Sequence, residues 1–181
     1  VATGLDLFDP IGLTEYGYTR YENVITSLEF ERILSPGGPF AGHVHRRSDG
    51  KEPQKIAWLQ CIGSRDAHHG ARNYCSSVCC TYSIKEAMLA KEHSKESLDA
   101  AIFFMDIRTP GKDFERFYDN AREKHGIRFI RSRVHSVDPV QGTDDLEIRY
   151  MTEGGEVVTE VFDIIVLSIG METSPEVIQL A

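Results

Sequence analysis

The apolar residues of this chain fall into short continuous runs separated by stretches with helical spacing. The runs that have the composition of buried strands are Lys55 to Cys61, Ala101 to Ile107 and Asp163 to Gly170. Helices are predicted between them, from about Ser76 to His93 and from about Lys112 to His125. Strands that alternate with helices in this way predict a parallel β-sheet covered by helices.

The second of these predicted helices has the clearest periodicity. Its apolar residues Phe114, Phe117, Tyr118 and Ala121 stand at positions i, i+3, i+4 and i+7, which places them on one face. Gly126 follows, at a position where helices commonly end in the left-handed conformation. We expect this face to pack into a hydrophobic core and to make no cofactor contact.

The C-terminal third of the chain is predicted to be mostly β-structure. A short strand is expected at 127–131, and two alternating segments, 146–152 and 156–162, flank the pair Gly154-Gly155 as a β-hairpin. The last buried strand follows this hairpin. We therefore predict an α/β, Rossmann-like three-layer domain in which a β-hairpin excursion interrupts the central parallel sheet.

The N-terminal segment is rich in loop-forming residues. One helix is predicted within it, because Thr26 and Glu29 have the spacing of a capping box and the run Pro36 to Pro39 ends the helical pattern. Its expected apolar face is Leu28, Ile33 and Leu34. A short basic stretch follows and is expected to be a solvated loop; it contains His43, His45, Arg46 and Arg47.

The turn after the first buried strand lacks the glycines of a dinucleotide site. A G-x-G-x-x-G sequence is needed there so that a pyrophosphate can approach the N-terminus of the following helix. Only Gly63 stands in that region of this sequence. We predict no functional nicotinamide site in this domain.

Composition and charge narrow the classes of partner. The 181 residues suffice for one sizeable domain, and 20 Lys and Arg against 28 Asp and Glu give a net charge of −8. Binding to nucleic acid requires a basic surface, so we expect no nucleic-acid partner. Because the sequence has no segment apolar enough to insert into a membrane and no secretory signal, we expect a cytoplasmic protein. The sequence begins without Met and ends in a stretch without Gly or Pro, so we expect a piece of a longer protein.

Four cysteines are the most specific chemical signal in the chain. Cys61, Cys75, Cys79 and Cys80 lie within twenty residues and follow the pattern C-x13-C-x3-CC. Soft, charged thiolate sulfurs are the ligands that the irons of an iron-sulfur cluster require. Adjacent cysteines project about 100° apart on a helix, which suits two different irons of a cube. The cysteines are therefore candidate ligands of an iron-sulfur cluster.

Two other interpretations of the cysteines stay open. Four thiolates also form a closed tetrahedral zinc site, and His68 and His69 lie in the same loop, although the spacing lacks paired CxxC sequences. Two disulfides are allowed by the count, but a chain with a core of this size and no secretory signal does not need them. Under the zinc interpretation, or if the site is empty, the chain is a structural or subunit-docking module.

Several segments together resemble the A subunit of heterodisulfide reductase, and the resemblance covers nearly the whole chain. They are Ala2 to Gly4 (ATG), Tyr16 to Leu34 (YGYTRYENVITSLEFERIL), Lys55 to Asp66 (KIAWLQCIGSRD) and Tyr74 to Glu92 (YCSSVCCTYSIKEAMLAKE). In that family a thioredoxin-reductase-like module binds FAD, and its inserted second domain holds an iron-sulfur cluster. The resemblance implies that the four cysteines are the ligands of a 4Fe-4S cluster.

The resemblance also implies where the flavin would lie. Thr3, Gly4 and Gly170 stand where the chain would cross from a FAD domain and return to it, so they are candidate FAD contacts. The inserted domain would resemble the pyridine-nucleotide domain of two-domain flavoprotein disulfide reductases. The implied division is a loop-rich connector from an upstream FAD domain at 1–53, the Rossmann-like inserted domain at 54–170 and a return segment at 171–181.

Electron transfer is the function that the resemblance implies. The chain would relay electrons between FAD and the 4Fe-4S cluster, toward partner subunits of a heterodisulfide-reductase-like complex that reduces a disulfide. Near the cysteines, Ser64 and Arg65 are expected to donate to sulfur or to offset its negative charge, and Tyr74 to shield one side from water. This chain is a part of an oxidoreductase in that interpretation, and we expect no catalytic residue within it.

Overall fold

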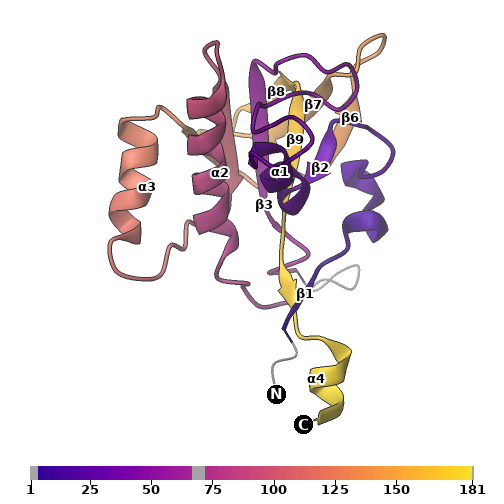
Figure 1. The fold of residues 1–181 in the computed structure, drawn as a ribbon, viewed down its shortest axis with the longest axis vertical. Helices are drawn as coiled ribbons and strands as arrows, with labels where there is room; N and C mark the ends of the chain where they lie inside the picture. The colour runs from indigo at the N-terminus through magenta and orange to yellow at the C-terminus, as the bar shows by residue number, and fades with distance from the viewer. Residues whose placement is uncertain (1–3, 67–71, 181) are drawn as a thin grey trace.

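The computed structural model describes residues 4–66 and 72–180, and a five-stranded parallel sheet lies at their centre (Figure 1). The order of the strands is β2-β9-β3-β4-β5. Their bounds are Val24–Thr26 for β2, Lys55–Ile62 for β3, Asp99–Phe104 for β4, Arg128–Arg131 for β5 and Ile164–Ile169 for β9. The predicted α/β fold with a parallel central sheet is confirmed.

Helices cover one face of the parallel sheet. They are α1 (Ser27–Leu34), α2 (Cys79–His93) and α3 (Phe114–Glu123). Ile56 and Trp58 of β3 are buried in the same cluster as residues of α1 and α2, and the ring of Phe30 meets the Trp58 ring edge-on at 5.4 Å. Because side chains alternate along a strand, these positions form the core on the helical side of the sheet.

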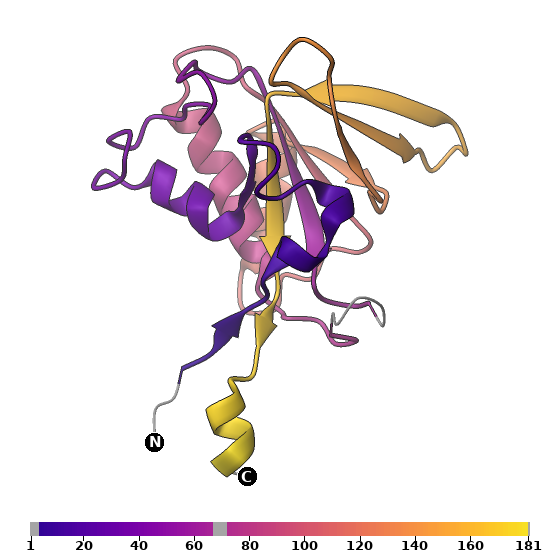
Figure 2. The same ribbon diagram turned by 90° about the vertical axis from the view of Figure 1, so that its right-hand side faces the viewer.

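An antiparallel sheet covers the opposite face (Figure 2). It consists of β6 (Val137–Pro139), β7 (Leu146–Met151) and β8 (Val157–Phe162), in that order. Ala57 and Leu59, which alternate with the helix-side residues of β3, pack here against Ile148 and Phe162. The predicted hairpin is confirmed, and the molecule has three layers: helices, parallel sheet and antiparallel sheet.

Residues before β3 contribute more to the core than the sequence indicated. The prediction of loops with one helix missed β2, which pairs in parallel with β9 at the edge of the sheet. It also missed two 3-10 helices, Pro10–Gly12 and Thr14–Tyr16. The division of the chain at 53 and 170 stays a prediction.

Helix α1 begins as predicted but buries a different face. Both hydrogen bonds of the capping box between Thr26 and Glu29 are present. Phe30, Ile33 and Leu34 are buried, whereas Leu28 is 57% exposed, so the prediction of Leu28 as a core residue is wrong. Phe30 takes its place because it lies on the side of the helix that faces Trp58.

Arg46 is buried, which corrects the expectation of a solvated basic loop. Its guanidinium Nη1 lies 2.7 Å from a carboxylate oxygen of Asp145 and 2.9 Å from one of Asp163. A third carboxylate, that of Asp49, lies 3.4 Å from its Nε. These contacts tie the loop before β3 to the residues that directly precede β7 and β9.

The two longer helices also differ from the prediction in detail. Helix α2 begins at Cys79 and not at Ser76, because Ser77 has a left-handed backbone conformation with a φ of +61°. In α3, the predicted core face is confirmed for the inner residues, but Phe114 is 39% exposed. Gly126 has the predicted left-handed conformation.

The strands β1 (Asp6–Leu7) and β10 (Met171–Glu172) pair as a short antiparallel ribbon. Together with α4 (Pro175–Leu180), this ribbon extends from the end of the sheet where β9 ends (Figure 2). Among the described residues, no helix has the length and apolarity needed to cross a bilayer.

Candidate metal centre

The four cysteines line one small enclosed pocket at the carboxyl ends of the central strands. Cys61 comes from the end of β3, Cys75 from the following loop, and Cys79 and Cys80 from the first turn of α2. None of the four forms a disulfide. The structure thus brings all of the predicted metal ligands to one place.

A bulge in β3 positions Cys61. The pairing of β3 with β9 is regular as far as Leu59, which lies opposite Leu167, and then shifts before Ile62, which lies opposite Ile169. Cys61 lies within this shift and has a φ of +63°, which is unfavourable for a residue with a side chain. Bulges commonly redirect a side chain, and this one accompanies the placement of the thiol in the pocket.

Backbone pairing within the loop brings Cys75 back toward Cys61. The amide of Arg65 donates to the carbonyl of Tyr74 at 3.1 Å, and the amide of Arg72 donates to the carbonyl of Gly63 at 2.9 Å. Cys75 precedes the first residue of α2, so it reaches the pocket from the loop and not from a helix face shared with Cys79.

The thiols near α2 contact backbone groups. The Cys79 thiol donates to the carbonyl of Ile169 at 3.6 Å. The Cys80 sulfur lies 3.9 Å from the carbonyl of Asp106 and accepts from the amide of Arg108 at 3.4 Å. The Cys75 sulfur accepts from the amide of Ser77 at 3.3 Å. A helix N-terminus and amide donors favour negative charge on sulfur.

Burial keeps three of the thiols protonated. It raises the pKa of Cys61 and Cys80 above the usual value and that of Cys79 to about 12. Hydrogen bonds and positive charge from Arg65 and Arg108 offset part of the effect at Cys61 and Cys80. Because a metal ligates the thiolate, a bound metal would displace these protons.

Arg65, Asp106 and Arg108 form a charged group at the pocket wall. The guanidinium of Arg65 pairs with one oxygen of the Asp106 carboxylate, and the Nε of Arg108 lies 2.9 Å from the other oxygen. Sequence reasoning singled out Arg65 but missed Asp106 and Arg108. Their place just after β4 was a usable signal, because ligands in α/β folds bind at the carboxyl ends of parallel strands.

Ser64 contacts a second serine. Its hydroxyl lies 2.7 Å from the hydroxyl of Ser76, which in turn accepts from the amide of Met171 at 2.9 Å. Tyr74 is 44% exposed, and its hydroxyl lies 3.5 Å from the carbonyl of Met171. These contacts connect the cysteine loop to β10.

Of the candidate flavin residues, Gly4 and Gly170 are described by the structure. Gly4 is exposed with a φ of +71°, and no atom lies within 4 Å of the place where a Cβ would be. Gly170 follows β9, and the hydroxyls of Ser64 and Ser76 crowd it. Thr3 and the loop histidines His68 and His69 lie outside the described residues.

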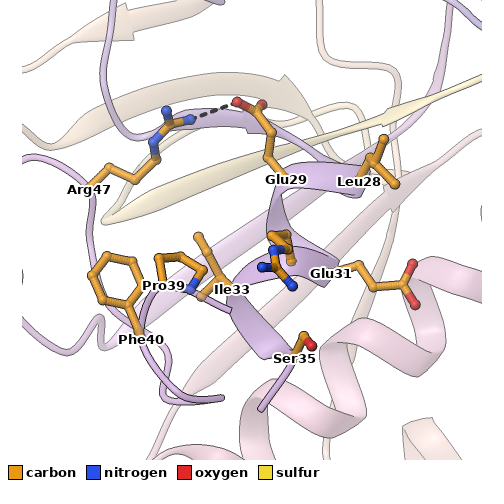
Figure 3. A pocket seen from close by; sticks show the side chains of 9 residues that line it. Leu28, Glu29, Glu31, Ile33, Ser35, Pro39, Phe40 and Arg47 are labelled. Carbon is orange, nitrogen blue, oxygen red and sulfur yellow. Dashed lines mark hydrogen bonds and ion pairs between the residues drawn. The ribbon is translucent and has the colours of Figure 1, made fainter. Parts of the chain in front are cut away.

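A wider hollow lies elsewhere, between α1 and the loop that follows it (Figure 3). It measures about 840 Å³, and its apolar wall includes Leu28, Ile33 and Phe40. An ion pair of 2.8 Å between Glu29 and Arg47 closes one side. None of its lining residues is a cysteine, so the hollow is separate from the thiol pocket.

The donor set of the thiol pocket fits an iron-sulfur cluster. Four thiols from three segments surround it, amides donate to sulfur, and guanidiniums lie at its wall. Within residues 4–66 and 72–180, no three His, Cys, Asp or Glu side chains converge on a single ion position. The four thiols line one pocket without such a convergence, and a cluster differs from a single ion in that each thiolate would bind a separate iron.

Comparison with known proteins identifies relatives over nearly the full length of the chain. It is 45% identical to one of the iron-sulfur A subunits of CoB-CoM heterodisulfide reductase in Methanopyrus kandleri, over 98% of this chain and 27% of that protein. It is 44% identical to the iron-sulfur A subunit of CoB-CoM heterodisulfide reductase in Methanocaldococcus jannaschii, over 99% of this chain and 27% of that protein. The chain matches the A subunit of heterodisulfide reductase. The resemblance found in the sequence is confirmed.

The match to the heterodisulfide reductase A subunit extends to more distant relatives. The chain is 38% identical to the A subunit of the ferredoxin/F420H2-dependent CoB-CoM heterodisulfide reductase of Methanosarcina acetivorans, over 95% of this chain and 21% of that protein. These relatives are oxidoreductase subunits by name, and the chain spans about a quarter of their length. No family model matches the chain.

A solved structure has the same fold. A 2-naphthoyl-CoA reductase in complex with 2-naphthoyl-CoA superposes with a TM-score of 0.54 at 17% identity, over 94% of this chain and 19% of that one. At this identity the likeness supports the fold alone. It agrees with the Rossmann-like architecture expected for this part of the heterodisulfide reductase A subunit.

Proposed function

We propose that this chain is an electron-transfer domain that binds a 4Fe-4S cluster through Cys61, Cys75, Cys79 and Cys80. The observation that carries the proposal is that all four thiols line one pocket. A bound cluster supplies a site that accepts and releases one electron at a time. The relatives named as iron-sulfur subunits support the assignment.

The residues of the chain have distinct roles in this proposal. The bulge at Cys61 and the left-handed turn at Ser77 fix the directions from which two of the thiolates approach. The amide of Arg108 stabilises a thiolate at Cys80. Cys79 and Cys80 are buried, so little water reaches the inner side of the pocket.

The pocket also takes the place of a dinucleotide site. In nucleotide-binding Rossmann folds, the pyrophosphate lies at the N-terminus of the helix that follows the first strand. Here α2 begins with Cys79 and Cys80 at that position. We infer that this domain has exchanged nucleotide binding for cluster binding, in agreement with the missing glycine sequence.

In the whole protein, we propose that electrons pass between FAD, this cluster and partner subunits, toward reduction of a disulfide in the cytoplasm. Thr3, Gly4 and Gly170 stay candidate FAD contacts. The exposed, left-handed Gly4 gives backbone freedom for close approach to a ligand. The ribbon β1-β10, near the thiol pocket, is where the chain would pass to a flavin domain.

Metal analysis of the full-length protein, purified without oxygen, tests the proposal. We expect four irons and four sulfides at this site, both lost when Cys79→Ser and Cys80→Ser are combined, and retained in the matched surface variant Ser97→Ala. Stoichiometric zinc, or iron that persists in the cysteine variant, would contradict it. Zinc would instead make this a structural or subunit-docking module.

A further inference from the structure

Asp106 lies at the junction of the two segments that approach the thiol pocket from β3 and β4. It is the second residue after β4 ends at Phe104, and its side chain is 40% exposed. Its backbone carbonyl faces the Cys80 sulfur, and the amide of Arg108 donates to the same sulfur. The segment from 106 to 108 therefore folds directly over one of the cysteines.

The Asp106 carboxylate binds two arginines at once. One oxygen pairs with Arg65, from the loop after β3, and the other pairs with Arg108 at 2.9 Å. Each oxygen thus holds one guanidinium, so a single carboxylate links the two loops. Without it, both long side chains would gain the freedom to extend into solvent.

The charges of this group bear on electron transfer. Reduction adds a negative charge in the pocket, and a fixed positive charge nearby favours the reduced state. Two guanidiniums and one carboxylate leave a net charge of about +1 beside the thiols. The carboxylate alone would act in the opposite direction.

We propose that Asp106 is a positioning residue that holds the guanidiniums of Arg65 and Arg108 against the thiol pocket. It would thereby raise the reduction potential of a cluster bound there. This inference rests on the proposed function, because it concerns a cluster bound at that pocket. Asp106 contacts the sulfurs only through its backbone, so its carboxylate acts through the two arginines.

The sign of a potential shift tests the inference. In the full-length protein we expect Asp106→Asn to lower the reduction potential of this site, because the two released guanidiniums outweigh the one carboxylate that is lost. A carboxylate that acted by its own charge would give the opposite result, since its loss raises the potential. An unchanged or raised potential in Asp106→Asn would overturn the inference.

A variant that lacks both arginines separates the effect of the arginines from the effect of the carboxylate's own charge. When Arg65→Gln and Arg108→Gln are both present, the potential is expected to fall, and adding Asp106→Asn is then expected to raise it. The matched control is Glu31→Gln, which removes an exposed carboxylate that pairs with Lys85 on the helical face, and it is expected to leave the potential unchanged.

The measurement is a redox titration followed by electron paramagnetic resonance, on the signal that Cys79→Ser removes. It reads loaded molecules alone, so partial cluster loss does not obscure the shift. If Asp106→Asn binds no iron, the variant with both Arg65→Gln and Arg108→Gln is measured in its place. A reduction potential of that variant equal to the parent's overturns the inference. A parent protein without iron and sulfide would instead refute the proposed function.

Discussion

Gly170 lies so close to Ser64 that a Cβ atom on Gly170 would be 2.0 Å from the Ser64 hydroxyl oxygen. The same atom would be 2.7 Å from the hydroxyl oxygen of Ser76. The two serine hydroxyls hydrogen-bond to each other, and Ser76 also accepts from the amide of Met171, which ties the cysteine loop to β10. Close packing therefore requires a glycine here whether or not Gly170 also touches a flavin.

Gly170→Ala is expected to destabilise the protein. The added methyl group must separate the two serines or shift β9, which costs about 1–3 kcal/mol in the free energy of unfolding. Urea denaturation measures the loss. Gly12→Ala is the matched control, because no atom lies within 4 Å of its Cβ position, and it is expected to have little effect. Equal stabilities for the two variants would contradict the packing argument.

Glu86 gives the stability a pH dependence. It is buried in α2, where the indole N–H of Trp58 donates to its carboxylate at 3.0 Å, and burial raises the pKa of Glu86 well above its usual value. A carboxyl group whose pKa is higher in the folded state binds its proton more tightly there. Its contribution to stability is complete below the unfolded pKa and declines as the pH rises above it.

Glu86→Gln removes this dependence while keeping an acceptor for Trp58. We expect the variant to be more stable than the parent at about pH 8, and to lose less stability than the parent between about pH 5 and pH 8. Denaturant titrations at both pH values make the comparison. The same substitution at Glu92, an exposed residue of the same helix, is the control. A parallel pH profile for Glu86→Gln and the parent would show that Glu86 is not responsible.

Loss of Arg46 is expected to be far more harmful than loss of its neighbour. Arg46→Ala leaves the carboxylates of Asp145 and Asp163 without their cation, and charged hydrogen bonds of this kind contribute about 2 kcal/mol. Arg47→Ala breaks only the half-exposed pair with Glu29, for a loss below about 1 kcal/mol. Thermal denaturation of both variants measures the difference, and similar losses would argue against a structural role for Arg46.

The parts of the fold that were predictable are those that a local pattern determines. The strands β3 and β9 are continuous apolar runs, the hairpin has a turn between two alternating segments, and the four cysteines that share one pocket are close together in the sequence. Each of these signals lies within about twenty residues of sequence.

The features that were missed depend on contacts between distant segments. Strand β2 has only three residues, too few to show a period, and it is a strand because β9 offers it an edge. Arg46 looked like a surface residue because its partners Asp145 and Asp163 lie about a hundred residues later. The approach of Asp106 to Arg65 likewise follows from the neighbouring positions of β3 and β4.

The position of β9 between β2 and β3 has a consequence for synthesis of the chain. Residues 164–169 are made long after β2 and β3, yet they form the strand that lies between those two in the sheet. Until they leave the ribosome, β2 and β3 have no bridge between them, and apolar strand edges stay open to other chains. The Ile169 carbonyl that receives the Cys79 thiol is also absent until then. Nearly this whole segment must therefore be translated before the thiol pocket is complete, and the nascent chain exposes apolar strand edges until then.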